Sequence, residues 1–150
     1  MIVYPDTSYL CALYREQNNT ELALAYDEQM TAPLQVSTLL EFEFRQAVRL
    51  QVWLNDQDRS KGYRQDEADR MLADWEIDIA AGHIRIVPVD MDAVLRMAEH
   101  LSQTHTYRTG NRTLDILHVA TALHLSAQAF LTFDDRQRKI ARAAGLQAPL

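Results

Sequence analysis

Short hydrophobic runs alternate with helix-like patterns along this chain, and that alternation limits the folds it can adopt. Strands that alternate with helices form parallel sheets with right-handed crossovers. We therefore expect an α/β fold. The expected strands lie at 2–5, 34–37, 84–89 and 129–133, and the expected helices at 8–16, 20–30, 38–56, 64–81, 91–104, 113–126 and 135–144.

The chain length and the hydrophobic content predict a single domain over residues 1–150. Its 150 residues are 47% hydrophobic, which is enough to build a core. The very polar segment Asn55–Gly62 reads as the turn between two long helices, so residues 38–81 form a helical hairpin insertion that could carry a partner interface. The last apolar stretch, 146–150, could add a fifth strand at one edge of the sheet.

No segment indicates a membrane protein or a secreted one. No stretch approaches the roughly 20 apolar residues of a membrane span, and the N-terminus lacks a basic region followed by a long apolar run. A cytosolic protein is expected. Cys11 is the only cysteine and lies in an apolar helical pattern, so we expect a small buried hydrophobe rather than a disulfide or a zinc ligand.

Acidic residues recur where strands give way to helices. Asp6 follows the first strand, Glu43 lies shortly after the second, Asp134 follows the fourth, and Asp115 lies in the helix leading to the fourth. In open α/β sheets, ligands bind outside the carboxyl ends of the strands. The conjunction of these four acids therefore points to a functional site.

Each acid also has a structural explanation when it is considered alone. Asp115 could complement a helix N-terminus that Thr113 caps, and Asp134 could itself be an N-cap. Glu43 could be an exposed helix residue and Asp6 a turn residue. Only the recurrence of all four favours a shared chemistry.

Four converging carboxylates would repel one another unless a cation neutralised them. Hard oxygen ligands select Mg²⁺ or Mn²⁺, and such a cation can activate water for attack on phosphorus. Phosphodiester hydrolysis is the expected reaction class. The hydroxyls of Thr7, Ser8 and Thr132 could orient the carboxylates by donating hydrogen bonds to them without binding the cation. Helix capping explains these hydroxyls equally well.

The net charge of −6 argues against tight non-specific binding to nucleic acid. A nucleic-acid substrate would need a local basic rim, for which Arg112 and Arg136 are the first candidates because they lie beside Asp115 and Asp134. Solvated helix faces explain these charges equally well. Further candidates for the rim are Arg45, Arg49, Arg138, Lys139 and Arg142.

Other reaction classes lack their sequence patterns. The five histidines include no His-Glu-x-x-His motif, the four glycines form no phosphate-binding loop, and no Gly-x-Ser-x-Gly elbow occurs. His118, on an apolar helix, is expected to be a packed and hydrogen-bonded residue rather than a metal ligand.

Four segments, in order along nearly the whole chain, resemble the PIN domain, specifically the VapC-like toxin ribonucleases of type II toxin–antitoxin systems. They are Val3–Ser8, Val36–Glu43, Arg112–Ala120 and Phe130–Gln137, followed by Ala141–Leu146. The resemblance implies a three-layer sandwich with a short parallel sheet of four to five strands flanked by helices. It also implies a Mg²⁺ or Mn²⁺ site, an RNA substrate, a small cognate antitoxin and a homodimer.

The resemblance assigns the catalytic and metal-binding roles to four residues. Asp6 would be the central ligand with Asp115 beside it, Asp134 would hold metal directly or through water, and Glu43 would complete the set. Asp134 is preferred to its neighbour Asp135, which remains the alternative, because the family's Thr-x-Asp pattern ends on Asp134.

The second ligand requires a choice between Glu41 and Glu43. The two lie two residues apart, so on a helix they face different directions. We select Glu43 because the family's acid is followed four residues later by a small residue, here Ala47, whereas Arg45 stands at that spacing after Glu41.

One departure from the family pattern is Pro5, which removes a backbone donor at the end of a central strand, and a strand that ends one residue early would accommodate it. The alternative function is a non-catalytic PIN-like module that binds RNA or a partner protein. The presence of all four acids argues against that alternative.

Overall fold

The structure is a computed structural model that describes residues 1–150. Its four strands are β1 (Val3–Pro5), β2 (Leu34–Ser37), β3 (Ile84–Val87) and β4 (Ala129–Leu131). Its helices are α1 (Thr7–Tyr14), α2 (Thr20–Asp27), α3 (Thr38–Gln57), α4 (Gln65–Ala81), α5 (Met91–Leu101), α6 (Tyr107–Thr109), α7 (Thr113–His124) and α8 (Asp135–Ala143), with a π-helical turn, η1 (Ser102–Thr106), between α5 and α6.

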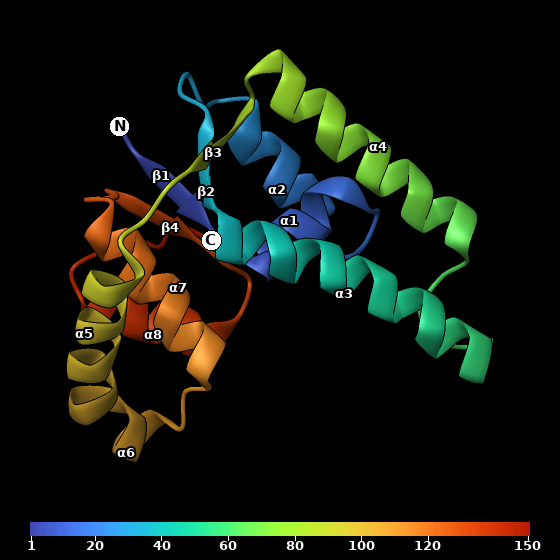
Figure 1. Ribbon diagram of the computed structural model, residues 1–150. Coiled ribbons are helices and arrows are strands. Elements are labelled where there is room, and N and C mark those ends of the chain that lie inside the picture. The colour runs from blue at the N-terminus through green and yellow to red at the C-terminus, as the bar shows by residue number, and fades with distance from the viewer.

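The predicted α/β class is confirmed. The strands form one parallel sheet in the order β3-β2-β1-β4. Helices flank the sheet, with α1 to α4 grouped on one side and α5 to α8 on the other (Figure 1). Because all four strands run the same way, the ends of β1, β2 and β4 bring the segments after them to one edge of the sheet.

The predicted fifth strand does not form. Gln147 makes a single parallel bridge to Ala129, in which the Phe130 amide donates to the Gln147 carbonyl at 2.8 Å. The guanidinium of Arg142 donates to the carbonyl of Ala148 at 2.5 Å. The C-terminal segment is therefore held along β4 by side-chain contacts as well as by one bridge, instead of by a ladder.

The predicted helical hairpin is present, and the connection between its helices spans 58–64 instead of the expected Asn55–Gly62. α3 continues to Gln57, because Asn55 is buried and its amide donates to the carbonyl of Lys61 at 2.8 Å, which stabilises the turn from inside. In Figure 1 the hairpin of α3 and α4 extends away from the sheet. The aromatic rings of Phe44 and Trp75 join its two helices, 4.8 Å between centroids.

The segment after α5 differs from the predicted continuous helix. α5 ends at Leu101 and the chain continues through η1 and α6. Threonine hydroxyls here donate to carbonyls one turn back, Thr104 to His100 at 2.9 Å and Thr109 to His105 at 2.8 Å. Such local bonds compete with regular helix geometry.

Pro5 is the last residue of β1, where the expected first strand also ends, so the strand does not stop one residue early to accommodate it. Pro5 pairs in register with Leu131 of β4, and the next amide, that of Asp6, donates to the Leu131 carbonyl at 2.9 Å. The missing donor of Pro5 therefore leaves the bond that places Asp6 intact.

No helix is long and apolar enough to cross a membrane.

Candidate functional site

Asp6 lies directly after β1 and caps α1. Its side chain is only 3% exposed. Oδ1 accepts hydrogen bonds from the Ser8 hydroxyl at 2.6 Å and from the Tyr9 amide at 2.9 Å, and Oδ2 accepts one from the Thr132 hydroxyl at 2.5 Å. The predicted support of Asp6 by Ser8 and Thr132 is thus visible as direct contacts.

Burial dominates the electrostatics of Asp6. Loss of solvent raises the pKa of its carboxyl, and the hydrogen bonds from Ser8, Thr132 and Tyr9 offset this only in part. None of those three donors carries a charge, so the buried carboxylate has no cation in direct contact. A bound divalent cation would favour its ionised form.

Asp134 joins Asp6 through Thr132. The Asp134 amide donates to the Thr132 hydroxyl oxygen at 3.0 Å, and that hydroxyl donates to Asp6. Asp134 is also the N-cap of α8, where Oδ1 accepts from the amides of Arg136 and Gln137. The capping interpretation is correct and leaves Oδ2 without a hydrogen bond.

Asp115 contacts α8 through Gln137. The Gln137 side-chain amide donates to Asp115 Oδ1 at 3.1 Å, while the Arg112 amide donates to Oδ2 at 3.2 Å. The N-cap residue of α7 is Arg112, not Thr113. The carboxylate of Asp115 accepts the hydrogen bond of the Arg112 backbone amide. Gln137 also bonds Asp134 through its backbone, so this one residue connects two of the predicted ligands.

Glu43 on α3 bonds His118 on α7. Glu43 Oε2 is hydrogen-bonded to His118 Nε2, and the ring is 1% exposed. Burial by itself raises the pKa of Glu43, but the hydrogen bond and charge of His118, with a smaller contribution from Thr7, lower that pKa overall. His118 is packed and hydrogen-bonded, as predicted.

The structure separates Glu43 from Glu41. Glu41 pairs with Arg45 at 3.0 Å, and Arg45 also pairs with Glu76 on α4 at 2.5 Å. Glu41 and Arg45 therefore belong to the contact between the hairpin helices, and Arg45 is not free for a substrate. Glu43 instead faces α7.

The remaining predicted residues are placed as follows. Thr7 is part-buried, and its hydroxyl oxygen has no hydrogen-bond partner of ordinary geometry. Asp135 is exposed and pairs with Arg138 at 2.5 Å. Arg138 and Arg142 donate to carbonyls of Leu150 and Ala148, so these two hold the C-terminal segment instead of forming a basic rim. Arg112 and Arg136 are exposed.

The donor chemistry of the four acids fits Mg²⁺ or Mn²⁺, which prefer carboxylate oxygens. The buried Asp6 without a cationic contact and the unbonded Oδ2 of Asp134 are consistent with such an ion. Their spacing is looser than a closed ligand set, since no group of three or more His, Cys, Asp or Glu side chains lies close enough to hold a metal. Hydrogen bonds link Asp6 to Asp134 through Thr132 and Asp134 to Asp115 through Gln137, whereas Glu43 bonds His118.

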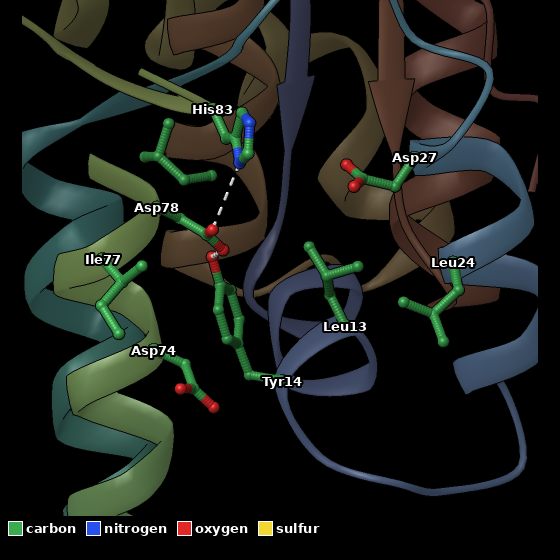
Figure 2. Close-up of a pocket in the computed structure, with 9 residues that line it drawn as sticks. Leu13, Tyr14, Leu24, Asp27, Asp74, Ile77, Asp78 and His83 are labelled. Carbon is green, nitrogen blue, oxygen red and sulfur yellow. Dashed lines mark hydrogen bonds and ion pairs between the residues drawn. The ribbon is translucent and has the colours of Figure 1, made fainter. Parts of the chain in front are cut away.

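A separate pocket lies near the amino end of β3, away from these acids. Figure 2 shows Tyr14, Asp78 and His83 converging there, with Asp27 across the opening. Tyr14 donates to Asp78 Oδ2 at 2.5 Å, and His83 Nδ1 lies 3.3 Å from Asp78 Oδ1. None of the predicted site residues lines this pocket.

Sequence reasoning missed the residues that connect the acids. Neither the role of Gln137 nor the pairing of His118 with Glu43 was predicted. The contacts of Tyr4 with His118 and with Ser37 were not predicted either. The sequence did contain a signal for Gln137. It lies three residues after Asp134, the N-cap of α8, so it belongs to the first turn of the helix that begins beside a predicted ligand. Nothing in the spacing pairs residue 43 with residue 118.

The PIN domain family model matches residues 3–143, so the chain belongs to the PIN domain family. Two similar solved structures are VapC20 of Mycobacterium tuberculosis, described as a sarcin–ricin-loop-cleaving toxin, and FitAcB of Neisseria gonorrhoeae. VapC20 has a TM-score of 0.65 and 18% identity over 97% of this chain and 96% of its own. FitAcB has a TM-score of 0.67 and 20% identity over 98% and 96%.

A third structure, PAE2754 of Pyrobaculum aerophilum, has a TM-score of 0.56 and 16% identity, over 99% of this chain and 83% of its own. At these identities the likenesses show a shared fold. Among curated proteins, no sequence matches this chain.

Proposed function

We propose that this chain is a metal-dependent endoribonuclease that hydrolyses RNA phosphodiester bonds and acts as the toxin of a toxin–antitoxin pair. The observation that carries the proposal is Asp6, a buried carboxylate at the end of β1 whose contacts lead through Thr132 to Asp134. Membership of the PIN domain family supports a nuclease. The description of VapC20 as a toxin supports the biological role.

In this proposal Asp6, Glu43, Asp115 and Asp134 hold Mg²⁺ or Mn²⁺. When bound, the cation supplies Lewis-acid stabilisation of the phosphate and a more acidic water. The chain's own residues orient the carboxylates: Ser8 and Thr132 fix both oxygens of Asp6, and Gln137 fixes Asp115. Fixed carboxylates need little rearrangement during the reaction, which favours catalysis.

The RNA backbone is bound by Arg112 and Arg136 in this proposal. Both are exposed and lie beside predicted ligands, Arg112 with its Nε 3.8 Å from Asp115 and Arg136 two residues after Asp134. Arg136 makes no ion pair, so it is available to a phosphate. These local cations would offset the net charge of −6 at the one place where RNA must approach.

We further propose a small cognate antitoxin that occludes the site, a homodimer, and action in the cytoplasm, where the RNA substrate lies. Exposed apolar side chains on one face of α3 support a protein interface, since Phe42 is 63% exposed and Trp53 58% exposed. Toxicity when the chain is expressed alone, relieved by the product of a neighbouring small gene, would support the toxin role. The mass of the purified chain in solution tests the homodimer.

Cleavage of a mixed cellular RNA pool tests the ribonuclease. The purified, antitoxin-free chain is incubated with Mg²⁺, Mn²⁺ or EDTA, beside Asp6→Asn and Asp115→Asn. Asp134→Asn is compared with Asp135→Asn, and Glu43→Gln with Glu41→Gln, because each control is a neighbouring acid engaged elsewhere. We expect metal-dependent cleavage that the four site variants lose and the two controls keep.

The opposite result would favour the non-catalytic PIN-like module. A folded, antitoxin-free chain that binds RNA but cleaves none with either metal would replace the nuclease proposal. Equal cleavage by wild type and Asp6→Asn would instead place the catalytic centre away from β1.

A further inference from the structure

A buried line of hydrogen bonds runs from the start of α3 to the carboxylate of Glu43. The Leu40 amide donates to the hydroxyl oxygen of Ser37 at 3.2 Å, and Tyr4 Oη lies 2.8 Å from that oxygen. Tyr4 Oη also lies 3.4 Å from His118 Nδ1, and His118 Nε2 bonds Glu43 Oε2. Four elements, β1, β2, α3 and α7, are thereby joined inside the fold.

For a neutral His118 ring, one direction of donation satisfies every group in the line. The Leu40 amide can only donate, so the Ser37 oxygen accepts and its own hydrogen is free for Tyr4. Tyr4 then donates to His118 Nδ1, which leaves the ring hydrogen on Nε2, facing Glu43. The reverse direction would place the lone pair of a neutral Nε2 against a carboxylate.

Tyr4 and Ser37 are suited to this role because both are completely buried, at 0% exposure. Burial raises the pKa of the Tyr4 phenol, so its hydrogen remains available at neutral pH. No water is needed to complete the line, because each member already has a protein partner.

The position of His118 ties Glu43 to the other acids. His118 follows Asp115 by three residues on α7, so the two side chains share a helix face. Tyr4 lies on β1, two residues before Asp6. A long Glu43 side chain that is a quarter exposed would otherwise be free to swing into solvent.

We propose that His118 is a positioning residue of this site, whose Nε2–H fixes Glu43 Oε2 and leaves Oε1 to face the cation. Tyr4 and Ser37 set the ring orientation that makes this possible. The inference rests on the proposed ribonuclease function for its role in cation binding. Partners that orient metal ligands in this way are worth about 10- to 100-fold in affinity or activity.

Cation binding by the full-length, antitoxin-free chain tests the proposal. Mn²⁺ titrations by calorimetry compare wild type with His118→Leu, which fills the space without a donor, and His118→Gln, whose side-chain amide can replace Nε2–H. We expect His118→Leu to bind about 10- to 100-fold more weakly and His118→Gln to recover most of the loss. His100→Leu, at an exposed histidine of α5, is the control.

A second measurement does not depend on metal or on the folding of the leucine variant. The ¹⁵N signals of the His118 ring in the metal-free wild type report which nitrogen carries the hydrogen. We expect Nε2–H, and we expect Tyr4→Phe to change the Nδ1 signal because it removes that donor alone. A hydrogen on Nδ1 facing Tyr4, with Nε2 bare, would overturn the inference.

The outcomes separate the inference from the proposed function. If wild type binds Mn²⁺ and cleaves RNA but folded His118→Leu does both equally well, the ribonuclease stands and the positioning role is wrong. If wild type neither binds Mn²⁺ nor cleaves RNA, the proposed function is wrong, and the ring signals alone decide whether His118 fixes Glu43.

Discussion

The side-chain amide of Gln137 donates to Asp115 Oδ1 at 3.1 Å, across the contact between α8 and α7. Gln137 is 4% exposed, and its carbonyl oxygen Oε1 has no hydrogen-bond partner. Its backbone amide meanwhile bonds Asp134 Oδ1 at 3.1 Å. A single neutral residue thus fixes the distance between two proposed metal ligands.

Gln137→Leu should lower the Mn²⁺ affinity about 10- to 100-fold, as expected when the partner of a metal ligand is removed. The change keeps the volume and the backbone bond to Asp134 but leaves Asp115 Oδ1 without its donor. Calorimetric titration measures it, with Lys139→Leu at an exposed position of the same helix as the control. An unchanged affinity would show that Gln137 serves packing alone.

Thr132→Val should destabilise the fold by about 1–3 kcal/mol, because it leaves Asp6 Oδ2 without its donor and the Asp134 amide without its acceptor. The two side chains have nearly the same shape, so lost packing contributes little. Urea unfolding in EDTA measures the change. Thr132→Ser, which keeps the hydroxyl, is the control, and equal stability of the two variants would contradict the prediction.

The order of elements and the places of the acids could be predicted from sequence because both depend on local patterns. Period and composition marked every strand of the sheet, and Asp6 and Asp134 follow strands that prove to be neighbours. Ser8 and Thr132 were found because they flank those strand ends. A parallel sheet then brings such segments together without further information.

The contacts that cross between elements could not be predicted in the same way. Glu43 and His118 lie 75 residues apart, and their pairing depends on how α3 and α7 cross the sheet. The arginines after Asp134 resembled a basic rim, yet Arg138 and Arg142 bind carbonyls at the chain end, which charge patterns do not reveal. The single bridge of Gln147 likewise depends on those contacts.

Gly62→Ala should destabilise the hairpin of α3 and α4 by more than the roughly 1 kcal/mol typical of an exposed Gly-to-Ala change at positive φ. Gly62 has φ +56°, and an added Cβ would lie 2.0 Å from the carbonyl oxygen of Gln51, so the turn must shift. Gly110→Ala is the control, because its φ of +61° is similar but nothing lies within 4 Å. Thermal unfolding should show the larger loss at Gly62.

Asp27→Asn should stabilise the fold at pH 7 by less than about 1 kcal/mol, a limit set by partial exposure. Burial, and then the charge of Asp78, raise the pKa of Asp27. A carboxyl with a raised folded-state pKa favours folding below its unfolded pKa of about 3.9, and this contribution disappears as pH rises through the folded value.

The gain from Asp27→Asn should therefore be present at pH 7 and absent near pH 3, where the wild-type carboxyl is protonated in both states. Urea unfolding at the two pH values measures it, with Asp69→Asn on the exposed face of α4 as the control. His83 lowers the pKa of Asp27 and lines the same pocket (Figure 2). If wild type is the more stable protein at pH 7, the attraction of His83 outweighs both burial and the repulsion of Asp78.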